Sequence, residues 1–133
     1  MLALVNCTSV WLCYAGHVSQ SPATPHPLPG PLVDVIAQRF RVLGEPMRIR
    51  LLDRLRESDA SVTELQEALG ASQQNVSKHL GILHAAGVVS RTKHGTTVRY
   101  AISDPGVFDL CDQVCGSVRR QLSELDAILH SAA

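Results

Sequence analysis

The middle of this 133-residue chain carries two short helical patterns separated by a glycine-containing turn, and this arrangement constrains the fold more than any other feature. Ser61–Glu64 fits a capping box, in which the serine oxygen accepts from a backbone N–H and the glutamate accepts from the serine N–H. The helix that it opens is expected to end at Gly70. Ser72 can then cap a second helix that runs from Gln73 to about Ala86. Two such helices joined by a short turn predict a helix-turn-helix.

A β-hairpin is expected directly after the second helix. Val88–Lys93 predicts a strand, His94 and Gly95 the turn, and Thr97–Ile102 the returning strand. Alternation along the returning strand places Val98, Tyr100 and Ile102 on one face. A hairpin in this position is a wing. The predicted fold class is therefore mainly α with a small β-hairpin, a winged helix-turn-helix that dimerises through terminal helices.

By composition, the chain divides into an N-terminal tail, residues 1–31, and one domain, residues 32–133. Five prolines between positions 22 and 31 exclude a regular helix there, so the tail is predicted to be extended or disordered. Apolar residues then recur at helical spacing over Leu32–Leu43, and Pro46 suits the first turn of the next helix. We expect residues 32–133 to form the DNA-binding and dimerisation domain, for the reasons that follow.

The distribution of charge is more informative than its sum, which is zero at pH 7. Between Glu67 and Asp104 the sequence has no carboxylate, whereas lysines, arginines and histidines all occur there. A neutral chain with one uniformly basic third can still present a positive surface, and such a surface favours double-stranded DNA as a partner.

Cysteine usage and hydropathy limit the compartment. The four cysteines are too sparse for a secreted disulfide scaffold, and the first twenty residues have no basic segment of the kind that opens a signal peptide. No stretch reaches the ~20 apolar residues that a membrane-spanning helix needs. These features predict a cytoplasmic protein with reduced thiols and no membrane partner.

The second helix of the motif has an outer face that suits DNA. Gln74, Ser77 and Lys78 lie on this face, with Gln73 exposed in the first turn, and no acid or large apolar side chain accompanies them. Glutamine pairs with adenine, serine contacts most base edges, and lysine favours guanine or phosphate. The alternative is a merely solvated face. His79 lies beside the edge of the core, and its position favours a packed, hydrogen-bonded histidine over a base contact.

The predicted wing adds basic residues to this surface. Arg91, Lys93 and Arg99 are spaced so that we expect them to point outward, where they would meet phosphate or the minor groove. The predicted DNA-contacting set is Gln73, Gln74, Ser77, Lys78, His79, Arg91, Lys93 and Arg99.

Four segments resemble the ArsR/SmtB family of bacterial repressors: 43–52 (LGEPMRIRLL), 72–80 (SQQNVSKHL), 83–89 (LHAAGVV) and 95–100 (GTTVRY). The resemblance covers residues 32 to about 130. It implies a winged-helix homodimer that sits on a near-palindromic operator and blocks transcription until an effector releases it. It also implies that Gln73, Ser77 and His79 match positions of the family's recognition helix.

The same resemblance implies effector sites that this chain matches poorly. Many metal-sensing members carry Cys-Val-Cys-Asp-Leu where this chain has Ser-Val-Thr-Glu-Leu at 61–65. Of a second, zinc-type ligand set, with equivalents here at Asp104, Gly106, Ser117 and Arg120, only the aspartate is kept.

A long final helix, from Pro105 to about Ser131, carries apolar residues at alternating spacings of three and four. This heptad seam predicts a two-helix dimer interface. The seam residues are Phe108, Cys111, Cys115, Val118, Leu122 and Leu125.

Cys111 and Cys115 on this helix admit three interpretations. They are small fillers of the seam, or ligands of a thiophilic metal or metalloid ion, or redox-active thiols. Thiols four residues apart on a helix are neighbours, and two copies would bring four sulfurs together. Cys7 or Cys13 of the tail could supply a further ligand.

The sequence therefore predicts a DNA-binding regulator, a homodimeric repressor released by a soft ion or by thiol chemistry at the last-helix cysteines. The alternatives are a constitutive winged-helix regulator without a small effector and a winged-helix protein-interaction module. An enzyme is not expected, because the sequence has no phosphate-binding glycine loop, metalloprotease motif or nucleophile elbow.

Overall fold

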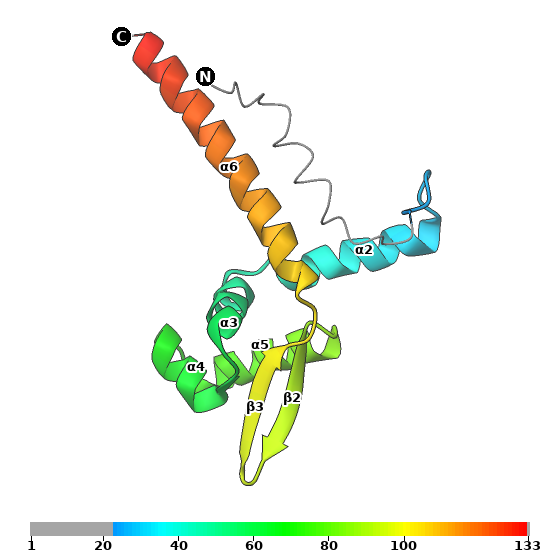
Figure 1. Cartoon of the computed structure of the whole chain (residues 1–133), viewed down its shortest axis with the longest axis vertical. Coiled ribbons are helices and arrows are strands. Elements are labelled where there is room, and N and C mark those ends of the chain that lie inside the picture. The colour runs from blue at the N-terminus through cyan, green and yellow to red at the C-terminus, as the bar shows by residue number, and fades with distance from the viewer. Residues whose placement is uncertain (1–22, 133) are drawn as a thin grey trace, which may run out of the picture. The chain divides into compact units, whose positions relative to one another are not determined.

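The computed structural model describes residues 23–132 (Figure 1). Cys7, Cys13 and most of the predicted tail lie outside the described residues, so the predicted division at residue 31 stays a prediction. Within the described residues, the chain divides into two units between Ala37 and Gln38. The elements, in chain order, are α2 (Gly30–Leu43), α3 (Pro46–Glu57), β1 (Ala60–Ser61), α4 (Val62–Leu69), α5 (Gln73–Ala85), β2 (Val89–His94), β3 (Thr97–Ile102) and α6 (Gly106–Ser131).

Local hydrogen bonds place the ends of α4 and α5 as the sequence predicts. Ser61 Oγ accepts from the Glu64 N–H at 3.2 Å, and the Glu64 carboxylate accepts from the Ser61 N–H at 2.7 Å, which completes the capping box. Gly70 ends α4 with φ of 60°, a left-handed conformation that favours glycine. Ser72 then caps α5 by accepting from the Asn75 N–H at 3.2 Å. The turn of the helix-turn-helix is therefore encoded locally.

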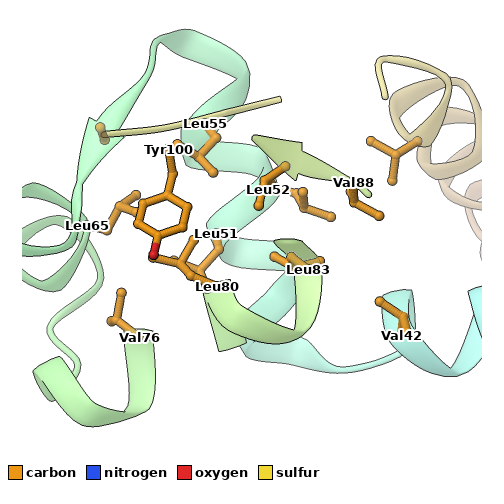
Figure 2. Packing of buried hydrophobic residues seen from close by; sticks show 13 residues of the cluster. Val42, Leu51, Leu52, Leu55, Leu65, Val76, Leu80, Leu83, Val88 and Tyr100 are labelled. Carbon is orange, nitrogen blue, oxygen red and sulfur yellow. The ribbon is translucent and has the colours of Figure 1, made fainter. Parts of the chain in front are cut away.

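An aliphatic core joins α3, α4, α5 and the sheet (Figure 2). Leu51, Leu65 and Leu80 are fully buried in it, and Tyr100 of β3 is the aromatic residue of this cluster, with an exposed fraction of 8%. This composition follows from the low aromatic content of the chain. The core fixes α5 on its inner side and leaves the opposite side of that helix for other uses.

The sheet has three antiparallel strands in the order β1-β3-β2, so the predicted hairpin is present with an additional short strand. β1 is only two residues long, and it pairs Ala60 with Tyr100 and Ser61 with Arg99. The turn of the hairpin is one residue later than predicted. His94 still pairs with Thr97, and the loop consists of Gly95, with φ of 63°, and Thr96.

Only Val107 is buried in α6, a helix of 26 residues. No helix among residues 23–132 is long and apolar enough to cross a bilayer. The predicted start at Pro105 agrees with the structure, in which Pro105 is the N-cap.

Candidate nucleic-acid interface

Helix α5 presents the predicted outer face. Gln73, Gln74, Ser77 and Lys78 are all exposed, whereas Val76 and its neighbours at helical spacing on the inner side are fully buried. The polar residues therefore cannot turn inward, and no carboxylate occurs among them. The exposed groups offer amide, hydroxyl and ammonium chemistry, which matches base edges and phosphates.

His79 does not share this outer face. Its side chain is only 12% exposed, and Nδ1 lies 3.1 Å from Nη1 of Arg48 and 3.5 Å from the Glu45 carboxylate, both at the start of α3. The Arg48 guanidinium also donates to the Val42 carbonyl at the end of α2. Of the two interpretations of His79, the geometry supports the packed histidine, which holds α5 against α3. Its predicted base contact has no support in this arrangement.

The Glu45 carboxylate is the acidic member of this cluster. Burial acts to raise its pKa, but hydrogen bonds from the N–H groups of Arg48 and Met47, with the charges of His79 and Arg48, lower it overall. Glu45 is also the N-cap of α3 and accepts from the Arg48 N–H at 3.0 Å. The cluster connects α3 with α5, and its charged groups are paired with one another.

The register of the hairpin corrects the prediction for the wing. Directly paired residues of an antiparallel ladder lie on one face, and the pairs here are Arg91 with Tyr100, Lys93 with Val98, and Thr92 with Arg99. Arg91 and Lys93 therefore lie on one face, the inner face, and Arg99 lies on the opposite, outer face. The prediction that all three side chains point the same way is wrong. With the loop at residues 95–96, odd-numbered residues of β2 pair with even-numbered residues of β3, so Arg91 and Arg99 lie on opposite faces.

Arg99 is engaged by the protein itself. Its Nε lies 2.9 Å from the Asp59 carboxylate, its Nη1 lies 3.1 Å from the Glu64 carboxylate, and its Nη2 donates to the Asp59 carbonyl at 2.8 Å. The hydrogen bond from Arg99 lowers the pKa of Asp59, against the opposing effect of burial. For Glu64, the N–H of Ser61 is the largest cause of a lowered pKa, and Arg99 adds to it. Two carboxylates thus neutralise this cation.

Arg91 and Lys93 differ from Arg99 in their exposure and in their pairing, the two properties that decide whether a cation can bind an anionic partner. Both are exposed, and neither makes an ion pair or a side-chain hydrogen bond with any residue between 23 and 132. Together with His84 and Val98, they line a hollow of about 230 Å³. Two residues of this surface were not predicted from the sequence. No local pattern indicates that Asp59 pairs with Arg99. His84 could have been found, because it follows Ser77 by seven residues and so lies on the same side of α5.

The predicted dimer seam on α6 divides into two parts. Phe108 is half-buried against the core of its own domain, with the Arg56 guanidinium 4.9 Å from its ring centre, so it is not a free seam residue. Val118, Leu122 and Leu125 are 46%, 61% and 56% exposed in the single chain. The apolar surface available to a partner therefore begins beyond Cys111.

The two thiols of α6 have different surroundings. Cys111 is half-buried, and burial raises its pKa, with the Asp112 and Asp53 charges adding to the effect and Arg56 opposing it. Cys115 is exposed. Among residues 23–132 no three histidine, cysteine, aspartate or glutamate side chains come close enough together to hold a metal ion. One copy of the chain therefore offers two sulfur ligands at most in this part of the structure.

Comparison with known proteins agrees with this architecture. A family model described as a helix-turn-helix domain matches residues 43–92. The transcriptional repressor SmtB of Mycobacterium tuberculosis is 40% identical over 90 residues, 68% of this chain and 67% of that protein. A probable mercury resistance operon repressor of Streptomyces lividans is 39% identical over 77 residues, 58% of this chain and 62% of that protein.

Solved structures agree as well. The crystal structure of Rv0081 from M. tuberculosis superposes with a TM-score of 0.65 at 36% identity, over 72% of this chain and 97% of that one. The homodimeric winged helix-turn-helix domain of Mb0332 from Mycobacterium bovis has a TM-score of 0.63 at 24% identity, over 80% and 94% of the two chains. Helix order, capping, wing and these likenesses lead to one conclusion: the chain belongs to the ArsR/SmtB family of winged helix-turn-helix DNA-binding transcriptional regulators, which are not enzymes.

Proposed function

We propose that this protein is a homodimeric repressor in which the two copies of α5 enter the major groove of one operator. The observation that carries the proposal is the outer face of α5, where two glutamines, a serine and a lysine are exposed with no acid among them. Arg91 and Lys93 extend this surface with two positive charges that have no ion-pair partner between residues 23 and 132. The proposed base contacts come from Gln73, Gln74, Ser77 and Lys78.

The second copy is proposed to pack on α6. Beyond Cys111 this helix has no core of its own, and an isolated helix is marginal in water. Its exposed aliphatic row, which runs from Val118 through Leu122 and Leu125 to Leu129, continues the heptad spacing of a two-helix interface. The homodimeric state of Mb0332 supports the same assembly here.

DNA binding and dimerisation are tested together. The purified chain should bind DNA from upstream of its own gene as a dimer, measured by fluorescence anisotropy and sedimentation velocity. Leu122→Asp should yield a monomer with much weaker DNA binding, whereas Gln121→Asp, which adds the same charge beside the seam, should remain dimeric. A monomeric wild type at micromolar concentration, or one that ignores every DNA fragment in dilute buffer, would contradict the proposal.

The effector is proposed to be a thiophilic metal or metalloid ion that binds Cys111 and Cys115. Two sulfurs from each copy would give the four ligands of a tetrahedral site, which one copy lacks within its described residues. The likeness to a probable mercury resistance repressor supports a soft ion. Binding at the seam would change the spacing of the two α5 helices, and half-sites on DNA lie about 34 Å apart. Coupling of this kind is typically about 1–3 kcal/mol.

The environment of Cys111 bears on both metal binding and thiol oxidation, because each requires the thiolate. Oxidation follows thiolate character, and the raised pKa of Cys111 keeps this thiol protonated at neutral pH. A metal displaces that proton, so its affinity should rise with pH.

The effector test uses the reduced protein bound to its DNA. Addition of Hg²⁺, Cd²⁺ or Zn²⁺ should release wild type from DNA and leave Cys111→Ser/Cys115→Ser bound. A Cys7→Ser/Cys13→Ser variant shows whether the tail supplies a further ligand. If the Cys111→Ser/Cys115→Ser variant responds as wild type does, the cysteines are fillers of the seam and the protein acts as a constitutive regulator.

A further inference from the structure

We propose that a second hollow, at the end of α2 and the start of α6, binds a small aliphatic α-amino acid in its zwitterionic form. The site is separate from the two thiols of α6 and would give the regulator an input of a different chemical class. The hollow has a volume of about 300 Å³. Its lining includes two charged side chains, Arg39 and Asp104, and four aliphatic ones, Leu43, Val88, Val107 and Leu110.

The aliphatic part of the lining limits the size and the body of the ligand. Val88 and Val107 are buried, and Leu43 and Leu110 are half-buried. Ligand pockets in proteins typically have volumes of about 300–1,000 Å³, so this hollow suits a small molecule. The described residues that line it include no aromatic side chain on which a ring could stack. An aliphatic body therefore matches this lining better than an aromatic one.

Two opposite charges lie close together in the lining without a hydrogen bond between them. Arg39 Nη2 is 3.9 Å from Asp104 Oδ2, whereas a hydrogen-bonded pair of this kind is about 2.7–2.9 Å apart. Both side chains are nearly half exposed, so solvent screens their attraction. Within residues 23–132, neither Arg39 Nη2 nor Asp104 Oδ2 makes a hydrogen bond. One guanidinium donor and one carboxylate acceptor are therefore available to a ligand.

Each charged group is held in place by another part of the protein. Arg39 Nη1 donates to the Ala86 carbonyl at 2.9 Å, at the C-terminal end of α5. The Asp104 N–H donates to the Val88 carbonyl at 3.3 Å, and Asp104 Oδ1 accepts from the Gly106 N–H at 3.2 Å. Both groups are thus positioned before a ligand binds, which reduces the entropy that binding costs.

This pair of charges selects a zwitterion. A simple carboxylate would be attracted by Arg39 and repelled by Asp104, and a simple amine or a metal cation would experience the reverse. An α-amino acid carries both charges on one carbon atom. Its carboxylate would accept from Arg39, its ammonium group would donate to Asp104, and its side chain would lie on the aliphatic lining.

The hydrogen bond from Arg39 to Ala86 connects the hollow to DNA binding, a consequence that rests on the proposed role of α5. Ala86 is the C-cap of α5, the helix that carries the proposed base-contacting residues. A ligand carboxylate competes with the Ala86 carbonyl for the donors of Arg39 and so loosens the end of α5. We expect the bound amino acid to lower DNA affinity by about 5-fold or more, as is typical of coupling between two sites.

The binding test uses the full-length reduced protein without DNA, and L-leucine as the probe. In an NMR titration at fixed pH, L-leucine should shift the methyl signals of Val88 and Leu110 and the Arg39 Nε–H signal. Two analogues leave the protein unchanged and each lack one charge: 4-methylpentanoate has no ammonium group, and 3-methylbutylamine has no carboxylate. Each should bind about 10-fold more weakly or worse, because it leaves one charged partner without its hydrogen bond.

Protein variants complete this arm of the test. Arg39→Gln and Asp104→Asn should weaken L-leucine binding, whereas Arg41→Gln, at another exposed arginine of α2, should bind it as wild type does. The absence of any shift with L-leucine would overturn the proposal. Equal binding of L-leucine and both analogues would overturn the assignment of a zwitterion.

The second arm measures DNA affinity with and without saturating L-leucine. DNA affinity should fall for wild type and for Cys111→Ser/Cys115→Ser, but not for Arg39→Gln. L-leucine binding with unchanged DNA affinity would overturn the link through Ala86. Binding by the Leu122→Asp variant alone would show that the second copy fills the hollow in the dimer, which would overturn the proposal. A wild type that binds L-leucine but no DNA would contradict the proposed function and support the amino-acid site.

Discussion

Both faces of the β2–β3 hairpin carry basic side chains, but the two faces differ in whether carboxylates of the protein pair with them. On the inner face, Arg91 and Lys93 are exposed and have no partner among the described residues. On the outer face, Arg99 is held by Asp59 and Glu64. An arginine whose charge is already balanced by two carboxylates gains little from a phosphate. The difference teaches that a basic wing is not one surface, and that pairing decides which of its cations serve a partner.

The largest expected effect comes from Tyr100, which lies on the inner face opposite Arg91 but reaches the core. Tyr100→Ala should reduce the free energy of unfolding by about 3–5 kcal/mol, because it removes a buried aromatic side chain. Thr92→Ala, on the outer face, should change it by less than about 0.5 kcal/mol. Urea unfolding followed by circular dichroism measures both. Equal losses would mean that the inner face does not seat the hairpin.

An exchange of two neighbouring residues tests the faces without changing composition. Arg91→Thr/Thr92→Arg moves one cation from the inner to the outer face and keeps the net charge. DNA affinity should fall about 5-fold at 150 mM salt, as expected for one lost phosphate contact. Anisotropy titration measures the loss. An exchanged variant that binds as tightly as wild type would show that the face of the cation is unimportant.

The smallest effect should come from Arg99→Gln, and it should appear in stability rather than in DNA binding. Asp59 and Glu64 have lowered pKa values in the folded chain, so their stabilisation is complete above their ordinary values and disappears as pH falls through the lowered ones. The thermal midpoint of Arg99→Gln should therefore lie slightly below that of wild type at pH 7, and the two should converge once the pH falls below the lowered pKa values of Asp59 and Glu64. Scanning calorimetry at several pH values checks this. A gap that persists in acid would assign Arg99 a role apart from these carboxylates.

Much of the site was predictable because its determinants are close together in the chain. The capping box of Ser61 and Glu64, the cap at Ser72 and the turn at Gly70 involve partners three to five residues apart. The period of α5 then separates its buried and exposed sides, which places Gln74, Ser77 and Lys78 outward. Periodicity alone could not settle His79 at the edge of that face, because Arg48 approaches it from 31 residues away.

The amino-acid sequence by itself determined the succession of helices, the wing and the acid-free side of α5, since caps, glycines and periodicity act over one or two turns. Tertiary structure decided three things: which face of the wing carries cations without a partner among the described residues, whether Phe108 belongs to the core or to the seam, and that Ala60–Ser61 becomes a strand. The physical reason is distance along the chain. Arg99 meets Asp59 across 40 residues, and a change of one residue in the pairing register of the hairpin moves the side chains of one strand to the opposite face.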